Sequence, residues 1–242
     1  MTRLLPLGLL VVLAATAGCT GAFGGGEIDR TALAGNQSYD WDTSADATLT
    51  VQRDSVLAVY AVENRSTVEV YAFQRFNNER AITPGAVRFR YPNGTVVGPE
   101  AMSFSRANSR TVVELPANEG QLAMTLPKSG KRVRLPVLVE GSHELVLPRN
   151  AEVRYFLLGR VVPPADDRFV GTDGRVHLVW DEVGRNRLVV EYYLERDLAI
   201  FAVVAALAGL LAVGGLVYFW LQLRELRERR QQVAWEDDPG AP

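Results

Sequence analysis

An uninterrupted apolar segment near the C-terminal end constrains this chain more than any other feature. Residues 198–223, LAIFAVVAALAGLLAVGGLVYFWLQL, run for 26 residues without a charge. A membrane-spanning helix needs about 20 apolar residues to cross a hydrocarbon core of roughly 30 Å. The segment therefore predicts one transmembrane helix, which is long enough to cross with some tilt.

A second, shorter apolar run lies at the N-terminal end. One cation, Arg3, precedes a mostly apolar stretch at 4–13, and small residues follow at 14–18. This order is typical of a secretory signal peptide, and the stretch is short for a permanent membrane span. We therefore expect residues 1–18 to be a signal peptide and the chain after it to be exported.

Cys19 is the single cysteine of the chain and directly follows these small residues. The sequence Thr16-Ala17-Gly18-Cys19 looks like the lipoprotein processing site of prokaryotes, at which the thiol is lipidated and the cysteine becomes the mature N-terminus. Bacterial sites favour leucine where Thr16 stands, so the motif fits the looser archaeal pattern better. We predict a lipid-anchor cysteine and a glycine-rich tether at 19–27. The alternative is a cysteine that is simply removed with the signal peptide.

The charges beside the long apolar segment predict its orientation. Four arginines follow it within residues 224–230, whereas 195–197 on the other side carry one cation and two acids. Positive flanks stay on the cytoplasmic side of a membrane. We therefore expect a single-pass cell-membrane protein with a short cytoplasmic tail at 224–242 and the bulk of the chain, 28–197, outside the cytoplasm.

The composition of the exported part argues for stability by packing and against nucleic-acid binding. Between residues 20 and 197 there are 21 Lys and Arg against 23 Asp and Glu, and no cysteine. Disulfides cannot contribute, and the even balance shows no basic patch of the kind that binds nucleic acid. Membrane lipid is the partner that the sequence implies, and no cofactor is expected.

Apolar and polar residues alternate along the exported part, which is the period of half-buried strands. Asn93-Gly94 lies between two such runs and is a strong hairpin signal. The runs lie at 48–51, 56–62, 68–76, 86–91, 102–105, 111–115, 132–139, 143–147, 152–161, 175–181 and 187–195. We predict a mainly β, sandwich-like extracytoplasmic domain at 28–197 plus the C-terminal transmembrane helix. A break near 127–131 would divide it into two small sandwiches. The sequence does not decide between one sandwich and two.

Residues with catalytic potential are few. The two histidines, His143 and His177, lie in strand-like runs, and we interpret both as ordinary strand residues. Ser142, His143 and Glu144 have the residue types of a catalytic triad, but neighbouring strand residues point to opposite faces and cannot form one relay. No nucleophile elbow, phosphate loop or zinc spacing occurs. We therefore predict no catalytic residue and no enzymatic activity.

One acidic stretch has a weak resemblance to a calcium loop. Oxygen side chains alternate at Asp40, Asp42, Ser44 and Asp46. The turn glycine of such a loop is replaced by Ala45, and Val51 stands where a bidentate glutamate belongs. We therefore predict no metal site and keep these four residues as the weak candidate.

Two further features concern modification and association. Three sequons place candidate glycosylation sites at Asn36, Asn64 and Asn93, each in an expected turn or loop. Small residues four apart in the apolar segment, such as Ala205 and Gly209, would let two copies pack through the helix. Self-association through this helix and an envelope protein are the partners to consider.

The layout of the whole chain resembles uncharacterised envelope lipoproteins of haloarchaea. The resemblance rests on the processing-site motif at Cys19, the predominance of arginine (24 of the 26 Lys and Arg), and the strand-like 189–197 running straight into the apolar segment. It implies a cell-surface protein and carries no catalytic residue. We expect a non-enzymatic binding or scaffolding module on the outer face of the cytoplasmic membrane. A surface enzyme or metal-dependent ligand-binding protein is the alternative.

Overall fold

The computed structural model describes residues 28–74, 78–155 and 158–236, and its largest element is an eight-stranded sheet. The strand order is β14-β15-β11-β1-β2-β9-β5-β6. β1 pairs in parallel with β11, and the other neighbouring strands in this order pair antiparallel. The strands are β1 (Ala47–Val51), β2 (Ser55–Val62), β5 (Gly85–Arg90), β6 (Val96–Val97), β9 (Gly120–Pro127), β11 (His143–Val146), β14 (Asp167–Val170) and β15 (Val176–Trp180).

Smaller sheets complete the domain. A four-stranded sheet, β4-β3-β8-β7, and a three-stranded sheet, β10-β16-β13, adjoin through β3 and β10, and a two-stranded sheet pairs β12 with β17. These strands are β3 (Thr67–Phe73), β4 (Glu79–Ala81), β7 (Ser103–Ala107), β8 (Arg110–Glu114), β10 (Arg132–Pro136), β12 (Ala151–Glu152), β13 (Arg160–Val162), β16 (Arg187–Glu191) and β17 (Tyr193–Leu194). Among the described residues, the short helix α2 (Arg30–Leu33) precedes β1, and the short helix η2 (Pro99–Ala101) connects β6 to β7.

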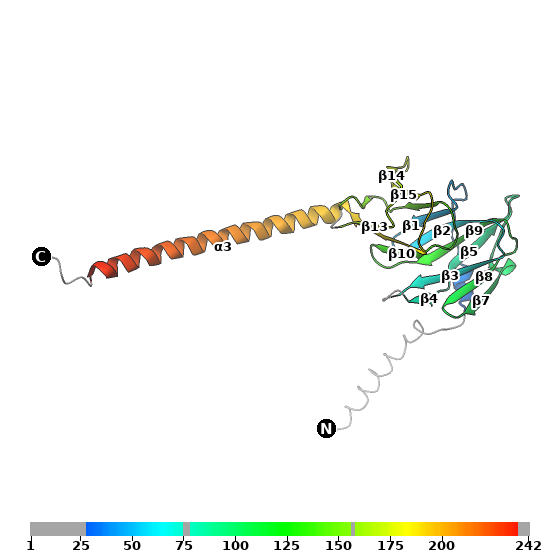
Figure 1. The fold of residues 1–242 in the computed structure, drawn as a ribbon, viewed down its shortest axis with the longest axis horizontal. Helices are drawn as coiled ribbons and strands as arrows, with labels where there is room; N and C mark the ends of the chain where they lie inside the picture. Colours follow the sequence, from blue (N-terminus) through cyan, green and yellow to red (C-terminus); the bar gives the residue numbers. More distant parts are fainter. Residues whose placement is uncertain (1–27, 75–77, 156–157, 237–242) are drawn as a thin grey trace, which may run out of the picture.

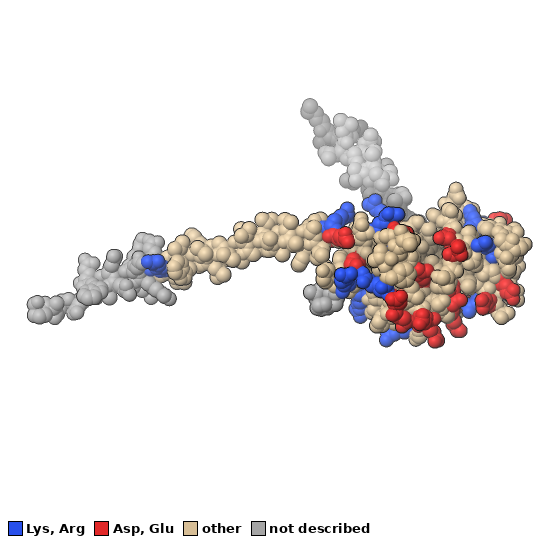
Figure 2. All heavy atoms as spheres, turned by 90° about the horizontal axis from the view of Figure 1, so that it is seen from above, with Lys and Arg blue, Asp and Glu red and all other residues tan. Residues whose placement is uncertain are grey.

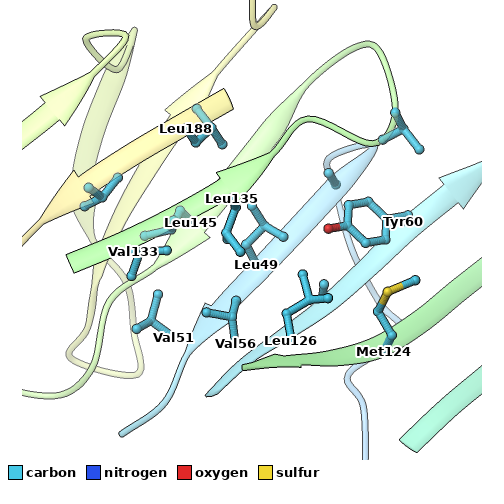
Figure 3. Packing of buried hydrophobic residues seen from close by; sticks show 14 of the residues in the cluster. Leu49, Val51, Val56, Tyr60, Met124, Leu126, Val133, Leu135, Leu145 and Leu188 are labelled. Atoms are coloured by element: carbon cyan, nitrogen blue, oxygen red, sulfur yellow. The ribbon is translucent and has the colours of Figure 1, made fainter. Parts of the chain in front are cut away.

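The main core lies between the large sheet and the smaller ones. One buried cluster combines Leu49 and Leu126 of the large sheet with Val133 and Leu188 of the three-stranded sheet and Val70 of the four-stranded one. Figure 3 shows Val133, Leu135 and Leu188 in one layer above Leu49, Val51 and Val56 in the other. The domain is therefore a sandwich, which confirms the predicted fold class.

The N-terminal segment covers part of the opposite face of the large sheet. Tyr39 packs there against Val59, Ala86 and Ala123. Its hydroxyl donates a hydrogen bond of 2.8 Å to the carbonyl oxygen of Ala86. The middle of the large sheet is thus buried on both faces.

This two-sided burial explains a strand that the sequence analysis missed. β9 lies between β2 and β5, and its residues Leu122, Ala123 and Met124 are all fully buried. A strand buried on both faces loses the alternation of apolar and polar residues by which strands are recognised. The predicted set of strands is therefore incomplete, and β9 has to be added to it.

The single strand predicted at 152–161 is also wrong. β12 ends at Glu152 and β13 begins at Arg160, and the amide of Gly159 donates a hydrogen bond of 2.7 Å to the carbonyl oxygen of Tyr155. A Cβ atom on Gly159 would lie 2.5 Å from the carbonyl oxygen of Val153. Glycine therefore lets the chain fold back on itself inside a run that reads as a strand.

The helix α3 (Glu195–Glu236) leaves the domain and projects from it as a long rod (Figure 1). Within it, Glu195–Arg224 is long and apolar enough to cross a membrane. Its apolar side chains are exposed; Leu211, for example, is 78% exposed. The described part of the domain therefore does not cover this helix. The helix also continues past the predicted end at residue 223.

Candidate functional site

The outer face of the β10-β16-β13 sheet gathers arginine side chains from three strands. Strand pairing sets Glu191 of β16 directly opposite both Arg132 of β10 and Arg160 of β13. Arg134 lies two residues after Arg132 and therefore on the same face, because side chains alternate along a strand. Arg187 is on this face of β16 for the same reason. The buried faces of these strands supply Val133 and Val190 to the core.

These side chains line a cleft of about 290 Å³, which we call the arginine cleft. The end of β3 borders it, where the Arg187 guanidinium lies 5.7 Å from the centre of the Phe73 ring. The lining residues are Phe73, Gln74, Arg132, Arg134, Arg160, Arg187, Val162, Val189 and Glu191. Among the described residues that line the cleft, four arginines therefore accompany one glutamate.

The single carboxylate neutralises one of the four arginines. Arg132 forms an ion pair with Glu191. Among the described residues, Arg134, Arg160 and Arg187 form no ion pair. The cleft therefore carries an excess of positive charge at its surface, which an anionic group would offset.

Arg110 differs from the arginines of the cleft, because two carboxylates of the same domain pair with its guanidinium group. Its guanidinium donates to both carboxylate oxygens of Glu79, at 2.9 and 3.1 Å, and also to Glu69. It lies 4.6 Å from the centre of the Tyr71 ring. The two carboxylates raise the pKa of Arg110. The arginine cleft lacks such an arrangement among the described residues.

The arginine cleft lies towards the end of the domain from which α3 leaves. Arg132 follows Lys131, whose ammonium group forms an ion pair with Asp197 in the first turn of α3. Figure 2 shows Lys and Arg gathered on this side of the domain, whereas Asp and Glu are more frequent on the rest of the visible surface. The expectation of no basic patch therefore needs correction: the net charge is even, but the cations are unevenly placed.

The two histidines occupy different environments, and neither lies in the arginine cleft. His143 is 1% exposed, and its Nδ1 donates a hydrogen bond of 2.9 Å to the Gly141 carbonyl oxygen. Its Nε2 is buried without a partner among the described residues. His177 instead contacts the carboxylates of Glu144, at 2.6 Å, and Asp173, at 3.3 Å. Glu144 and His143 point to opposite faces, as the strand period predicts.

The four residues of the weak calcium candidate do not converge. Asp40 accepts a hydrogen bond from the amide of Asp42, while Asp46 accepts two from Ser142, from its amide at 2.7 Å and its hydroxyl at 2.8 Å. These bonds lower the pKa of Asp46. In the described ranges, no three His, Cys, Asp or Glu side chains gather where they could hold a metal ion. Asp46 instead joins the start of β1 to the start of β11.

The structure describes the three candidate glycosylation sites but not the candidate lipidation site. Asn36, Asn64 and Asn93 are exposed, and Asn93 accepts a hydrogen bond of 2.9 Å from the Thr95 amide within a turn. Cys19 and the predicted signal peptide lie outside the described residues.

Comparison with known proteins gives a match to a family model. The model of a family of unknown function, DUF5803, matches residues 43–238, which cover most of the domain and all of α3. No curated protein and no solved structure matches.

Proposed function

The chain belongs to the DUF5803 family, whose function is unknown, and we propose from its structure that it is a membrane-anchored, non-enzymatic binding module. In this proposal the arginine cleft holds a carboxylate-rich segment of an envelope protein on the outer face of the cytoplasmic membrane. The resemblance to haloarchaeal envelope lipoproteins supports the same location.

The observation that carries the proposal is the set of arginines without ion pairs in the cleft. A guanidinium presents its donors in a planar fork that matches a carboxylate, and two parallel hydrogen bonds make the contact specific. Arg134 and Arg160 are exposed and have no such partner among the described residues. An acidic peptide would supply to them what Glu79 supplies to Arg110.

The anchoring part of the proposal joins the two ends of the chain. The apolar part of α3 crosses the membrane with its C-terminal arginines inside, the signal peptide is removed, and lipid on Cys19 holds the N-terminus at the same surface. Cys19→Ser tests the lipid. We expect it to abolish labelling by a radioactive lipid precursor and to change the mass of the mature protein, whereas unchanged labelling would refute lipidation.

The binding site can be tested by crosslinking in native membranes. A photoreactive amino acid replaces Gln74, which lines the cleft, in the tagged full-length chain. Crosslinked partners are purified and their joined peptides sequenced. We expect a peptide rich in Asp and Glu, and we expect its yield to fall strongly in an Arg134→Ala/Arg160→Ala variant.

The matched control removes two exposed arginines elsewhere, Arg30→Ala/Arg106→Ala, and should leave the crosslink unchanged. Thermal unfolding of each variant checks that the domain stays folded. Equal yields from the two double variants would exclude the arginine cleft as the binding site. Recovery of crosslinks to the same chain alone would favour self-association instead.

A further inference from the structure

A second cleft, of about 800 Å³, lies where the domain meets α3, and we call it the junction cleft. Three turns of the domain and the first turn of α3 form its walls. Its cations come from separate parts of the chain: Arg53 follows β1, Lys131 precedes β10, Arg149 follows β11 and Arg196 lies in α3. Folding therefore brings together four cations that are far apart in the sequence.

The length of α3 sets the depth of this cleft relative to a bilayer. The apolar segment begins at Leu198, and the aromatic residues Tyr218, Phe219 and Trp220 follow 20 to 22 positions later. At about 1.5 Å per residue, Leu198 and Tyr218 are roughly 30 Å apart, which is the thickness of the hydrocarbon core. Tyrosine and tryptophan favour the membrane interface. Residues 194–197 then lie in the opposite headgroup layer, which is about 6 Å deep.

The wall of the junction cleft is held in place by its own contacts. The Lys128 ammonium donates to the carbonyl oxygen of Arg53, at 2.9 Å, and to the hydroxyl of Tyr192, at 3.1 Å. The amide of Glu195 donates to the carbonyl oxygen of Asn150, at 3.1 Å. These bonds join three turns of the domain to the start of α3.

Within the described part of the chain, two of the cations form no close ion pair, so their charges are available to an anion. The Arg53 side chain is 96% exposed, and its pairing with Asp54 is loose, at 4.0 Å. Arg149 is exposed and forms no ion pair among the described residues. Lys131, by contrast, pairs with Asp197. An anion in the junction cleft would therefore meet the guanidinium groups of Arg53 and Arg149 first.

A nearby loop exposes side chains suited to the same depth. Tyr155 is 52% exposed and its ring lies 5.9 Å from that of Tyr193 in β17, the strand that leads into α3. Leu158, three residues later, is 40% exposed. Tyrosine and leucine at the level of the headgroups would contact the upper ends of the acyl chains.

From this placement we propose that the junction cleft binds the phosphate of an anionic lipid headgroup in the outer leaflet. Arg53 and Arg149 contact the phosphate, whereas Lys131 and Arg196 both lie beside the Asp197 carboxylate and contribute less. The inference concerns a site separate from the arginine cleft, and it rests on α3 crossing the membrane. Bound lipid would fix the orientation of the domain on the bilayer, which the short connection at 195–197 already restricts.

The test uses the full-length chain purified in a neutral detergent. Phosphatidylglycerol and phosphatidylcholine with the same acyl chains are titrated separately, and bound lipid is counted by native mass spectrometry. We expect tighter binding of phosphatidylglycerol. Each cation close to an anionic headgroup contributes about a fivefold factor in affinity, so Arg53→Ala/Arg149→Ala should weaken phosphatidylglycerol binding about 30-fold. Phosphatidylcholine binding should not change.

Two variants serve as controls. Arg53→Lys/Arg149→Lys keeps the charges and should retain the preference for phosphatidylglycerol, and Arg30→Ala/Arg106→Ala should behave as wild type. Equal affinity for the two lipids, or no effect of Arg53→Ala/Arg149→Ala, would overturn the proposal. Displacement of the lipid by an excess of inorganic phosphate would assign the cleft to free phosphate and also overturn it. Carbonate extraction of native membranes checks the spanning helix separately, because an unanchored chain would be released.

Discussion

The buried imidazole of His143 should couple folding to pH in a range where few other groups titrate. The ring is 1% exposed, and its Nε2 has no hydrogen-bond partner among the described residues. Burial lowers the pKa of His143, and the hydrogen bond to the Gly141 carbonyl and the charge of Asp46 only partly oppose this. The folded domain therefore binds this proton less readily than the unfolded chain does.

The sign and the upper limit of the change in stability with pH follow from this difference in proton binding. Above the pKa of an unfolded histidine, about 6.5, the ring is neutral in both states and stability is unaffected. Below it, the unfolded chain binds a proton that the folded domain does not bind, so stability falls as the pH falls. One such proton is worth at most about 1.4 kcal/mol between about pH 7.5 and about pH 5.5. For a domain of this size that is roughly 3–5 °C in Tm.

The assay compares the full-length protein with His143→Gln, which has similar volume and does not titrate. Thermal unfolding is followed by near-ultraviolet circular dichroism in the same detergent at both pH values. We expect the Tm of the wild type to fall by several degrees more than that of His143→Gln. His177→Gln, which removes a histidine with two carboxylate partners, is the control and should keep the contribution of His143. An equal fall in the wild type and His143→Gln would refute the reasoning.

Three other substitutions test the packing of the domain by the same unfolding measurement. Asp46→Asn weakens the charged hydrogen bonds to Ser142 and should cost about 1–2 kcal/mol near neutral pH; because these bonds lower the pKa of Asp46, the difference should fade below its ordinary value of 3.8. Gly120→Ala places a Cβ 2.4 Å from the Arg90 carbonyl oxygen at a φ of +146° and should cost about 2 kcal/mol or more; an unchanged Tm would contradict this geometry. Trp180→Ala empties a site that is 1% exposed and should cost about 3–5 kcal/mol, so a loss below about 1 kcal/mol would mean that Trp180 is not a core residue.

Most strands could be predicted because one of their faces is buried and the other is exposed to solvent. β1 shows this best: Ala47, Leu49 and Val51 are buried and the residues between them are partly exposed. β9 could not be found in this way, because the segment around Tyr39 covers its second face. That cover comes from residues about 80 positions away and leaves no local pattern.

The candidate sites were less predictable than the fold. Arg132 and Arg134 are two apart on one strand, but Arg160 and Arg187 reach the same cleft through strand pairing across 28 and 55 positions from Arg132. Counting charges along the chain averages such residues with acids that lie elsewhere. Conversely, the spacing of Asp40, Asp42 and Asp46 suggests a cluster, and the structure turns Asp46 away to Ser142.

The sequence alone determined the features that depend on local order. These are the apolar segment able to cross a membrane, the alternating strands of a mainly β domain, and the short connection between them at 195–197. Only the tertiary structure decided which strands share a sheet, which strand is buried on both faces, and which cations meet at the two clefts. The physical reason is range: hydrophobic periodicity is set by neighbouring residues, whereas strand pairing and the cost of gathering like charges depend on residues brought together by folding.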